Sequence, residues 1–339
     1  MSLLEVKDLH VSFKTYGGEV KAVRGVNFSL REGETLAIVG ESGCGKSVTA
    51  QSLMRLIPDP PGKITAGSIL FKGKEITRMT ERDIRKLRGA EIAMIFQDPM
   101  TSLNPTITIG ELIMEAVREH KQVSRAEARE QALEVLAQVG IPNPAERLKQ
   151  YPHQFSGGMR QRIMIAVALV CGPSVLIADE PTTALDPTIQ AQIIDLFKEI
   201  QRKTGVSIIM ITHDLGVVAQ IADRINIMYA GQVVETGTLS DIFYRAQHPY
   251  TKGLLQSVPR LDGDRNRPLI PIAGTPPDLF APPQGCPFVA RCKYAMEVCD
   301  RFAPPATPIS NGHAVNCWLQ DDRAKAVREA VREGQPAMR

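Results

Sequence analysis

The sequence predicts an α/β protein whose parallel sheet holds a phosphate-binding loop at one edge. Three observations support this fold class. Residues 40–47, GESGCGKS, fit the phosphate-loop pattern G-x-x-x-x-G-K-[ST] at every fixed position. Apolar runs at 35–39, 92–96 and 175–178 are typical of fully buried parallel strands. Each run leads directly into glycine-rich, amide or acidic residues, and open α/β sheets place their ligand contacts at such strand ends.

The loop at 40–47 has the composition that phosphate binding requires. Its glycines let consecutive backbone N–H groups point at a polyphosphate, and the helix expected over 47–56 adds its positive N-terminal end. Lys46 would neutralise the β- and γ-phosphates, and the Ser47 hydroxyl would hold Mg²⁺. A glycine-rich turn with a chance lysine is the alternative, and the flanking strand and helix disfavour it. The predicted nucleotide contacts are Gly40, Ser42, Gly43, Cys44, Gly45, Lys46, Ser47 and Val48.

Length and composition indicate a globular protein with a large domain and an appendage. The chain has 339 residues, of which 43% are hydrophobic and 23% are charged. Its net charge of +3, from 40 basic and 37 acidic residues, is too balanced to indicate nucleic-acid binding. No apolar run approaches the roughly 20 residues that span a bilayer, and residues 1–5 begin no signal peptide. We therefore expect a cytosolic protein, or one peripheral to a membrane on its cytosolic side.

The N-terminal region is expected to form antiparallel β structure beside the nucleotide core. Residues 4–13 alternate apolar and polar side chains, which predicts a half-exposed strand. Gly17 and Gly18 turn the chain into a second strand over 20–30. Tyr16 lies at this turn, where an aromatic ring can stack on adenine, although tyrosine is also an ordinary turn residue.

The segment after the phosphate loop supplies a strand, a polar residue and a helical insertion. A small strand and hairpin are expected at 67–74, and the buried strand 92–96 delivers Gln97 to its end. Helices are expected at 109–120 and 125–139. A capping box of Ser124 and Glu127 begins the second of these helices.

Residues 155–161, FSGGMRQ, precede another long helix and form a second candidate anion site. Ser156 suits the N-cap position, and Gly157 and Gly158 expose backbone N–H groups. A single chain would not need two anion sites for one γ-phosphate. Two chains placed head to tail would each contribute one of the two sites to a shared γ-phosphate. The sequence therefore indicates that two protomers share each nucleotide.

Two acidic residues and a histidine follow the next two buried strands. Asp179 would reach Mg²⁺ directly or through water, and Glu180 would be the base that polarises the attacking water. The alternative is that both acids only cap the following helix. It is disfavoured because charges at the end of a buried strand need a cationic partner. The strand 206–211 presents His213, which is either a γ-phosphate contact or a structural histidine.

Four of the six cysteines gather near the end of the sequence. They are Cys286, Cys292, Cys299 and Cys317, whereas Cys44 and Cys171 are isolated. In a reducing cytosol such a group favours a metal site over disulfides. The surrounding stretch is rich in proline and is expected to have little core of its own, so a four-thiolate site would supply cross-links. The closer C-x₂₋₄-C pair of most zinc sites is absent, and the spacing alone leaves the metal open, with free or disulfide-bonded thiols as the alternative.

Together these motifs resemble the ATP-binding subunits of ABC transporters in order and spacing. The resemblance covers residues 1 to about 240. It rests on the phosphate loop, Gln97, Ser156-Gly157-Gly158, Asp179-Glu180, Ala184-Leu185-Asp186 and His213. The signature departs from the family's usual form, because Phe155 replaces Leu and Met159 replaces Gln. The three residues that would touch phosphate are intact.

The resemblance implies a P-loop nucleoside triphosphatase core with ATP and Mg²⁺. The implied catalytic residues are Glu180, His213 and Gln97, and the implied Mg²⁺ contacts are Ser47, Gln97 and Asp179. Further implied nucleotide contacts are Tyr16 at the adenine ring, Asp186, and the partner-facing Ser156, Gly157 and Gly158.

A narrower resemblance extends over nearly the whole chain. The segments 97–105, 151–156, 228–231, 248–251 and 274–277 are similar to those of dipeptide, oligopeptide and nickel importer ATPases, in particular the D-type subunits. This likeness implies a peripheral ATPase at the cytoplasmic face of the inner membrane, paired with a homologous F-type subunit under two permease subunits. An extracytoplasmic binding protein would deliver peptide to the permeases. The likeness also favours a 4Fe-4S cluster at the four cysteines over zinc.

The expected organisation has three parts. An ATP-binding domain at 1–255 contains a helical subdomain at about 98–172, and a Cys-rich extension at 256–322 and a charged tail at 323–339 follow. The tail is expected to form a short helix with a solvated face or a face that touches anionic lipid. A soluble ATPase of the same superfamily that acts on nucleic acid is the rival function, but this chain carries a single set of motifs without a long coiled coil. A non-hydrolysing regulatory protein would lack Glu180 or His213.

Overall fold

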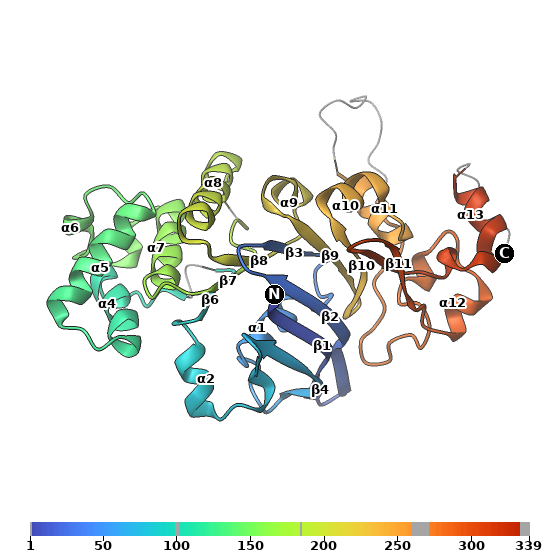
Figure 1. The fold of residues 1–339 in the computed structure, drawn as a ribbon, viewed down its shortest axis with the longest axis horizontal. Helices are drawn as coiled ribbons and strands as arrows, with labels where there is room; N and C mark the ends of the chain where they lie inside the picture. The colour runs from blue at the N-terminus through green and yellow to red at the C-terminus, as the bar shows by residue number, and fades with distance from the viewer. Residues whose placement is uncertain (1, 99–101, 184, 259–270, 333–339) are drawn as a thin grey trace.

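The computed structural model describes residues 2–98, 102–183, 185–258 and 271–332. In these ranges the chain forms two sheets with helices around them (Figure 1). The main sheet has eight strands in the order β11-β12-β10-β9-β3-β8-β7-β6, and the second sheet has four in the order β2-β1-β4-β5. The predicted α/β fold class is confirmed.

The strands, in chain order, are β1 (Ser2–Thr15), β2 (Gly18–Arg31), β3 (Thr35–Val39), β4 (Gly62–Phe71), β5 (Lys74–Glu75), β6 (Ile92–Ile95), β7 (Val175–Asp179), β8 (Ser207–Thr212), β9 (Arg224–Tyr229), β10 (Gln232–Thr238), β11 (Ala306–Ser310) and β12 (His313–Asn316). The helices are α1 (Lys46–Leu53), α2 (Glu81–Leu87), α4 (Ile109–His120), α5 (Arg125–Gln138), α6 (Pro144–Arg147), α7 (Gly157–Leu169), α8 (Pro187–Thr204), α9 (Leu215–Ile221), α10 (Leu239–Arg245), α11 (Pro249–Gln256), α12 (Glu297–Arg301) and α13 (Lys325–Arg332). Every strand and helix expected before residue 213 is present.

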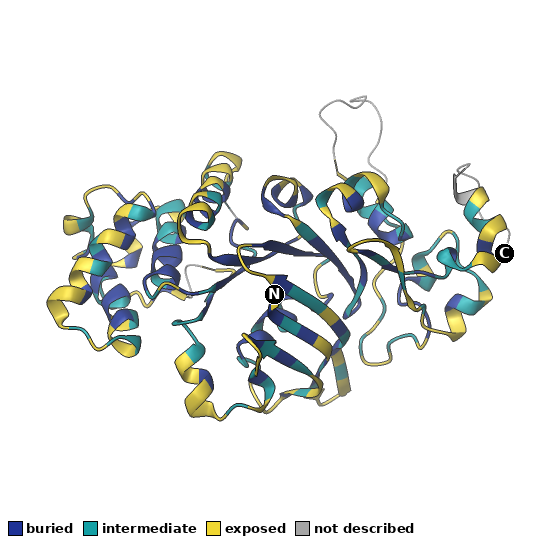
Figure 2. Cartoon of the chain, viewed as in Figure 1, coloured by how far each residue is buried: buried dark blue, intermediate teal, exposed yellow. Residues whose placement is uncertain are grey.

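Five strands at the centre of the main sheet run parallel. β3 pairs with β9 on one side and β8 on the other, and β7 and β6 follow β8. Every residue of β3, β7 and β8 is buried, which accounts for the apolar runs that make up most of each strand (Figure 2). Because these strands are parallel, the segments after β3, β8, β7 and β6 leave the sheet at one common edge.

The antiparallel sheet lies against α1 and one face of the main sheet. β1 pairs with β2 and with β4, both in antiparallel register. Leu4, Val6 and Leu9 of β1 share a buried core with Leu53 of α1 and Ile38 of β3. The alternating pattern at 4–13 therefore predicted the buried face of this strand correctly.

Helices α4, α5, α6 and α7 form a helical block at the β6 end of the main sheet, on the left of Figure 1. Apolar side chains of α4, α5 and α7 share one core with α8 and with β7. Side-chain caps fix three of the helix starts, because Thr108, Ser124 and Ser156 each accept the backbone N–H three residues further on. The capping box of Ser124 and Glu127 is confirmed.

The C-terminal extension differs from the sequence-based expectation. We expected a stretch with little core of its own, whereas β11 and β12 continue the main sheet through antiparallel pairing of β12 with β10. Phe288 is buried together with Tyr229 of β9 and Tyr250 of α11. Pairing between distant segments orders the extension, and the local sequence of the extension gives little indication of that pairing. Pro308 fits because β11 lies at the edge of the sheet, where a missing N–H is tolerated.

A buried polar contact also joins the extension to the main sheet. The Glu235 carboxylate in β10 lies 2.9 Å from Nε2 of His313 in β12. The same carboxylate accepts the backbone N–H of Gln247 at 2.7 Å and of His248 at 3.0 Å. All three contacts are needed, because a buried carboxylate without partners is strongly destabilising.

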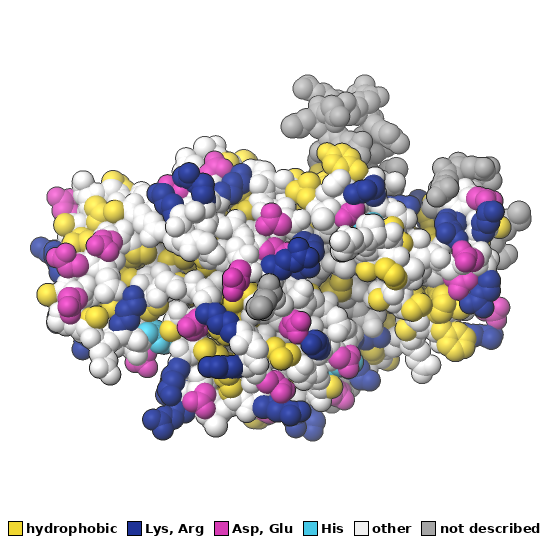
Figure 3. Space-filling view, viewed as in Figure 1, with side chains coloured by type: hydrophobic (Ala, Val, Ile, Leu, Met, Phe, Trp, Pro, Cys, Tyr) yellow, Lys and Arg dark blue, Asp and Glu magenta, His cyan; other side chains and the backbone are white. Residues whose placement is uncertain are grey.

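Surface charge is mixed on the face shown in Figure 3, where basic and acidic side chains are interspersed. One groove is more basic. Arg82, Arg85 and Lys86 of α2 line it together with Glu119 and His120 of α4. Within the described ranges, no helix has the length and apolar character that crossing a membrane requires.

We predict that His313→Ala lowers the free energy of unfolding by about 3 kcal/mol, since it leaves the Glu235 carboxylate buried without its ring partner. Urea unfolding of both proteins measures the difference. His10→Ala is the matched control, because His10 forms an exposed pair with Asp8 and should change stability by less than about 1 kcal/mol. Equal effects of the two substitutions would show that the buried contact does not hold the extension in place.

Candidate active site

The phosphate loop connects β3 to α1 and packs closely on two other strands. Gly45 has φ of 98°, and a Cβ atom there would lie 2.4 Å from the carbonyl oxygen of Ala22 in β2. A Cβ atom on Gly40 would lie 2.1 Å from the carbonyl oxygen of Met228 in β9. Both positions therefore require glycine, and the loop path is fixed by its neighbours as well as by its own sequence.

Lys46 is the first residue of α1, and its side chain is only 5% exposed. Its Nζ atom donates to the carbonyl oxygens of Gly40 at 2.9 Å and of Glu41 at 3.0 Å. The ammonium group is thus held inside the curve of the loop, beside backbone N–H groups. A phosphate group in this loop would meet a fixed positive charge.

Ser47 and Asp179 form the second part of the site. The Ser47 hydroxyl donates to Oδ1 of Asp179 at 3.0 Å, which joins the start of α1 to the end of β7. Asp179 is 4% exposed, and this burial raises its pKa, whereas the Ser47 hydrogen bond lowers it. A hydroxyl and a carboxylate at this distance are the oxygen ligands that Mg²⁺ prefers.

Glu180 lies at the centre of three side-chain contacts. Its Oε2 atom accepts the Gln97 amide at 3.2 Å and the Thr183 hydroxyl at 3.0 Å. Its Oε1 atom lies 3.4 Å from Nδ1 of His213. Glu180 also has a left-handed backbone, with φ of 48°, which is rare for a residue other than glycine and tends to occur at functional sites.

The sheet explains why these residues meet. Gln97 follows β6, Asp179 ends β7 with Glu180 directly after it, and His213 follows β8, so neighbouring strands deliver these residues to one edge. The backbone N–H of Glu180 also donates to the carbonyl oxygen of Ile211 in β8 at 2.9 Å. The sequence therefore predicted correctly that these side chains lie together, and their catalytic roles stay predictions.

Other predicted site residues lie apart from this group. Tyr16 is fully exposed at the turn between β1 and β2. Ser156 caps α7, and its first turn packs on α8, where a Cβ atom on Gly158 would lie 2.7 Å from Cγ2 of Ile189. Asp186 caps α8 through the N–H groups of residues 188 and 189. In Figure 1 α7 lies with the helical block at one end of the main sheet, whereas α1 lies near its centre.

Ala184 and residues 99–101, which belong to segments used for the family resemblance, lie outside the described residues. The other predicted contacts in the phosphate loop occupy the turn between β3 and α1 or the first turn of that helix. They are Ser42, Gly43, Cys44 and Val48.

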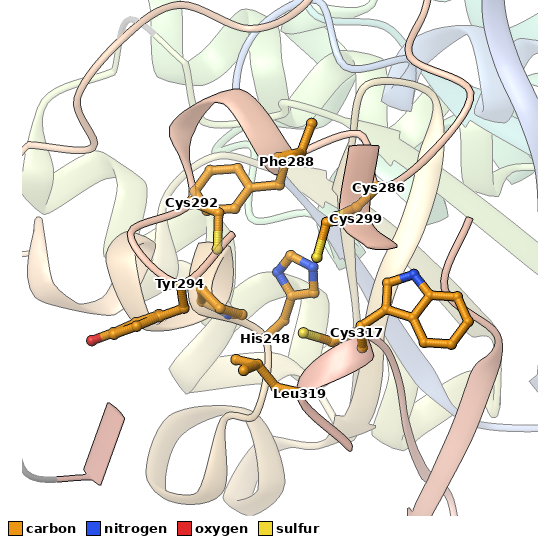
Figure 4. Close-up of a pocket in the computed structure, with 11 residues that line it drawn as sticks. His248, Cys286, Phe288, Cys292, Tyr294, Cys299, Cys317 and Leu319 are labelled. Carbon is orange, nitrogen blue, oxygen red and sulfur yellow. The ribbon is translucent and has the colours of Figure 1, made fainter. Parts of the chain in front are cut away.

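The four clustered cysteines line one small cavity between the extension and α11 (Figure 4). All six cysteines of the chain are described, and each is a free thiol. Burial raises the pKa of Cys286 to about 12, of Cys292 to about 11 and of Cys317 to about 12, and it also raises that of Cys299. The backbone N–H groups of Phe288, Tyr294 and Leu319, each two residues beyond a cysteine, oppose these increases.

His248 shares the cavity with the thiols and was not expected there. Its Nδ1 atom accepts the backbone N–H of Tyr250 at 3.1 Å, so the ring proton of the neutral histidine lies on Nε2. Burial lowers the pKa of His248 to about 3, which keeps the ring neutral. The buried Nε2 atom has no hydrogen-bond partner in the described part of the chain, and Figure 4 shows the ring among the cysteine side chains.

The predicted metal-binding role of the extension is not supported by the side-chain arrangement. In the described ranges, no group of three or more His, Cys, Asp or Glu side chains is placed to hold a metal ion. The sequence predicted that the thiols gather, and the structure brings them to one cavity without the short spacing of ligands around a metal.

Contacts that the sequence did not predict reach the phosphate loop from far along the chain. Arg291, next to Cys292, pairs with Glu41, and the Tyr250 hydroxyl accepts the backbone N–H of Glu41 at 3.0 Å. The segment 248–251, HPYT, carries a family likeness but no local sign of this contact. Arg291 carries no local signal, because its partner lies 250 positions away.

Comparison with known proteins defines the class of this site. The family model described as "ABC transporter" matches residues 23–183. A solved dimeric structure of the ATP-binding cassette MJ0796, in a post-hydrolysis state bound to ADP and Pi, aligns with a TM-score of 0.63 and 28% identity. The alignment covers 70% of this chain and 98% of that one. The fold is that of an ABC ATPase.

The particular group follows from longer matches. The dipeptide transport ATP-binding protein DppD of Bacillus subtilis is 65% identical over 95% of this chain and 96% of its own length. The oligopeptide transport ATP-binding protein OppD of the same organism is 57% identical over 97% and 93%. A second family model, "Oligopeptide/dipeptide transporter, C-terminal region", matches residues 234–299. The chain therefore belongs to the ATP-hydrolysing subunits of the dipeptide and oligopeptide ABC importers.

The raised pKa of Asp179 gives a pH-dependent prediction. Because the folded pKa lies above the unfolded value, the folded state holds more protons between the two values, and stability falls as the pH rises through them. We predict that Asp179→Asn raises the thermal midpoint of the nucleotide-free protein at pH 8. The gain should shrink as the pH falls through the raised pKa, since the native carboxyl is then neutral too.

Thermal unfolding at pH 8 and pH 5 checks this prediction. Asp195→Asn is the matched control, because Asp195 is exposed on α8 and should shift the midpoint little at either pH. A lower midpoint for Asp179→Asn at both pH values would contradict the argument.

Proposed function

We propose that this chain hydrolyses ATP with Glu180 as the base that activates the attacking water. The contacts of Glu180 with Gln97 and His213 carry this proposal, because they place a carboxylate, an amide and an imidazole side by side. The amide would hold the carboxylate and the water in line, and His213 would contact the γ-phosphate. Lys46 and the loop N–H groups would hold the β- and γ-phosphates. Mg²⁺ bound by Ser47, Asp179 and Gln97 would neutralise charge on the phosphate oxygens.

The second half of each site is proposed to come from a partner chain. Ser156 and Gly157 are exposed at the start of α7, on a part of the molecule separate from the phosphate loop. A head-to-tail pair would bring this helix start, with its free N–H groups, to the γ-phosphate of the other protomer. ATP would then join the two chains, and hydrolysis would release them. The proposed partner is a homologous F-type subunit, with Asp186 near the shared nucleotide.

The transported solute is proposed to be a dipeptide or oligopeptide. The names of the relatives, dipeptide and oligopeptide transport ATP-binding proteins, support this choice over nickel. Two permease subunits would lie above the pair at the cytoplasmic face of the membrane, and an extracytoplasmic binding protein would deliver peptide. The groove of Arg82, Arg85 and Lys86 beside α4 offers a basic surface that could contact a permease subunit. Closure would pass to the permeases through the region from Gln97 to Pro105 and the helical block.

The proposed organisation is an ATP-binding domain at 1–255, with its helical subdomain at about 98–172, an extension at 256–322 and a tail at 323–339. The extension is proposed to hold a 4Fe-4S cluster, with zinc as the alternative. The four thiols line one cavity, and the unpartnered Nε2–H of His248 could donate to a thiolate, but in the described residues the thiols would have to move closer together to ligate a cluster. A bound cluster would cross-link Cys286, Cys292, Cys299 and Cys317.

Glu180→Gln tests the catalytic proposal. We predict that the variant binds ATP, loses about 10²- to 10⁴-fold in turnover and stays in the closed pair, because only the base is removed. Phosphate release and size-exclusion chromatography with the F-type partner measure these effects. Glu199→Gln is the matched control on the exposed face of α8, and it should hydrolyse ATP normally. Normal hydrolysis by Glu180→Gln would show that another group is the base.

The extension is tested by metal analysis of the full chain purified without oxygen. We predict visible absorbance together with about four iron and four sulfide per chain, as expected for a 4Fe-4S cluster. Cys292→Ser should lose both, whereas Cys171→Ser, outside the cavity, should keep them. A colourless protein with one zinc per chain would show that the site binds zinc and not a cluster. A metal-free protein would contradict both proposals.

A further inference from the structure

The C-terminal extension makes a two-bond ion pair with the phosphate loop. Arg291 ends a short 3-10 turn (Val289–Arg291) directly before Cys292. Its Nη1 atom donates to Oε2 of Glu41 at 2.7 Å, and Nη2 donates to Oε1 at 3.1 Å. The Arg291 side chain is 5% exposed and that of Glu41 is 25% exposed. Such bidentate, sheltered pairs fix orientation as well as distance.

Arg291 is itself fixed from several sides. It donates to the Tyr229 hydroxyl at 3.2 Å, to the carbonyl oxygen of Ile272 at 3.1 Å and to that of Ala273 at 2.9 Å. The guanidinium group also lies over the rings of Tyr229 and Phe288, at 5.7 Å and 5.9 Å from their centroids. Burial opposes its charge, but the bonds to Glu41 and Tyr229 outweigh burial and raise the pKa. The cation is therefore a rigid anchor.

Glu41 is held in the phosphate loop by contacts of its backbone N–H, its carbonyl oxygen and its carboxylate. Its backbone N–H donates to the Tyr250 hydroxyl at 3.0 Å, and its carbonyl oxygen accepts Nζ of Lys46 at 3.0 Å. Its carboxylate is held by Arg291. Rotation of this residue would move the carbonyl group that positions the Lys46 ammonium. By holding the Glu41 carboxylate, Arg291 therefore also influences the position of the Lys46 ammonium group, because Glu41 contacts both side chains.

Neighbouring parts of the extension lie along the same side of the site. Pro276, Pro277 and Leu279 line a small cavity together with the loop residues Glu41 to Cys44. The backbone N–H of Lys21 in β2 donates to the carbonyl oxygen of Leu279 at 2.9 Å. The segment 271–292 is therefore attached to both the loop and β2, and Arg291 is the part that makes an ion pair with the loop.

We propose that Arg291 is a positioning residue for ATP binding, which holds Glu41 so that Lys46 and the loop N–H groups face the phosphates. This inference rests on the proposed assignment of the phosphate loop as the ATP site. A purely structural role for Arg291, as a tether of the extension, is the competing explanation. It predicts a change in stability without a change in nucleotide affinity.

The test uses the full chain, assembled with its partner for the kinetic measurements, and Mg-ATP as the probe. We predict that Arg291→Ala raises the Kd and the KM for Mg-ATP about tenfold and changes kcat less than about twofold, because Glu180 and its contacts remain. Glu41→Gln should weaken binding in the same direction. Arg291→Ala combined with Glu41→Gln should be no worse than Arg291→Ala alone, since both remove one interaction.

Controls separate this inference from the assignment of the site. Arg301→Ala, which removes an exposed pair with Glu297 on α12, should leave Kd and KM unchanged. Lys46→Ala should abolish ATP binding, and if it does not, the site assignment is wrong whatever Arg291 does. If Arg291→Ala does not fold, Arg291→Lys and Glu41→Gln carry the test. Kd values within about twofold of the native protein for Glu41→Gln and for the folded Arg291 variant would overturn the proposal.

Discussion

Parallel pairing of β3, β8, β7 and β6 is the constraint on which the rest of the molecule depends. Their shared direction brings four strand ends to one edge, and each end carries one part of the site. Lys46 follows β3, His213 follows β8, Glu180 follows β7 and Gln97 follows β6. Slippage of any strand by one residue would turn its buried side chains toward the opposite face, so the packing of the core also keeps the polar groups aligned.

The site concentrates features that cost stability. Asp179 carries a carboxylate in a buried position, and Glu180 adopts a left-handed backbone. Lys46 is buried with backbone carbonyl groups as its hydrogen-bond partners. The surrounding core offsets these costs, because β3, β7 and β8 are buried over their whole length. A well-packed sheet therefore lets a small number of unfavourable groups stay where phosphate chemistry needs them.

Local sequence patterns predicted the parts of the fold that local physics determines. The phosphate loop, the capping box at Ser124 and the polar residues after apolar strands could each be read from a few neighbouring positions. The pairing of β12 with β10, the contact of His313 with Glu235 and the ion pair of Arg291 with Glu41 could not. Each of these joins segments far apart in the chain, and no periodicity or motif marks them. The four cysteines lie between these cases, because their gathering was predicted but their arrangement was not.

The attachment of Arg291 to Glu41 has a consequence for the order of events during synthesis. The loop residues leave the ribosome early, and their guanidinium partner is added 250 positions later. A nascent chain can therefore form the central strands before Glu41, the second residue of the loop, has its ion-pair partner. Translation must therefore continue at least 250 positions beyond Glu41 before the nucleotide site takes its final arrangement.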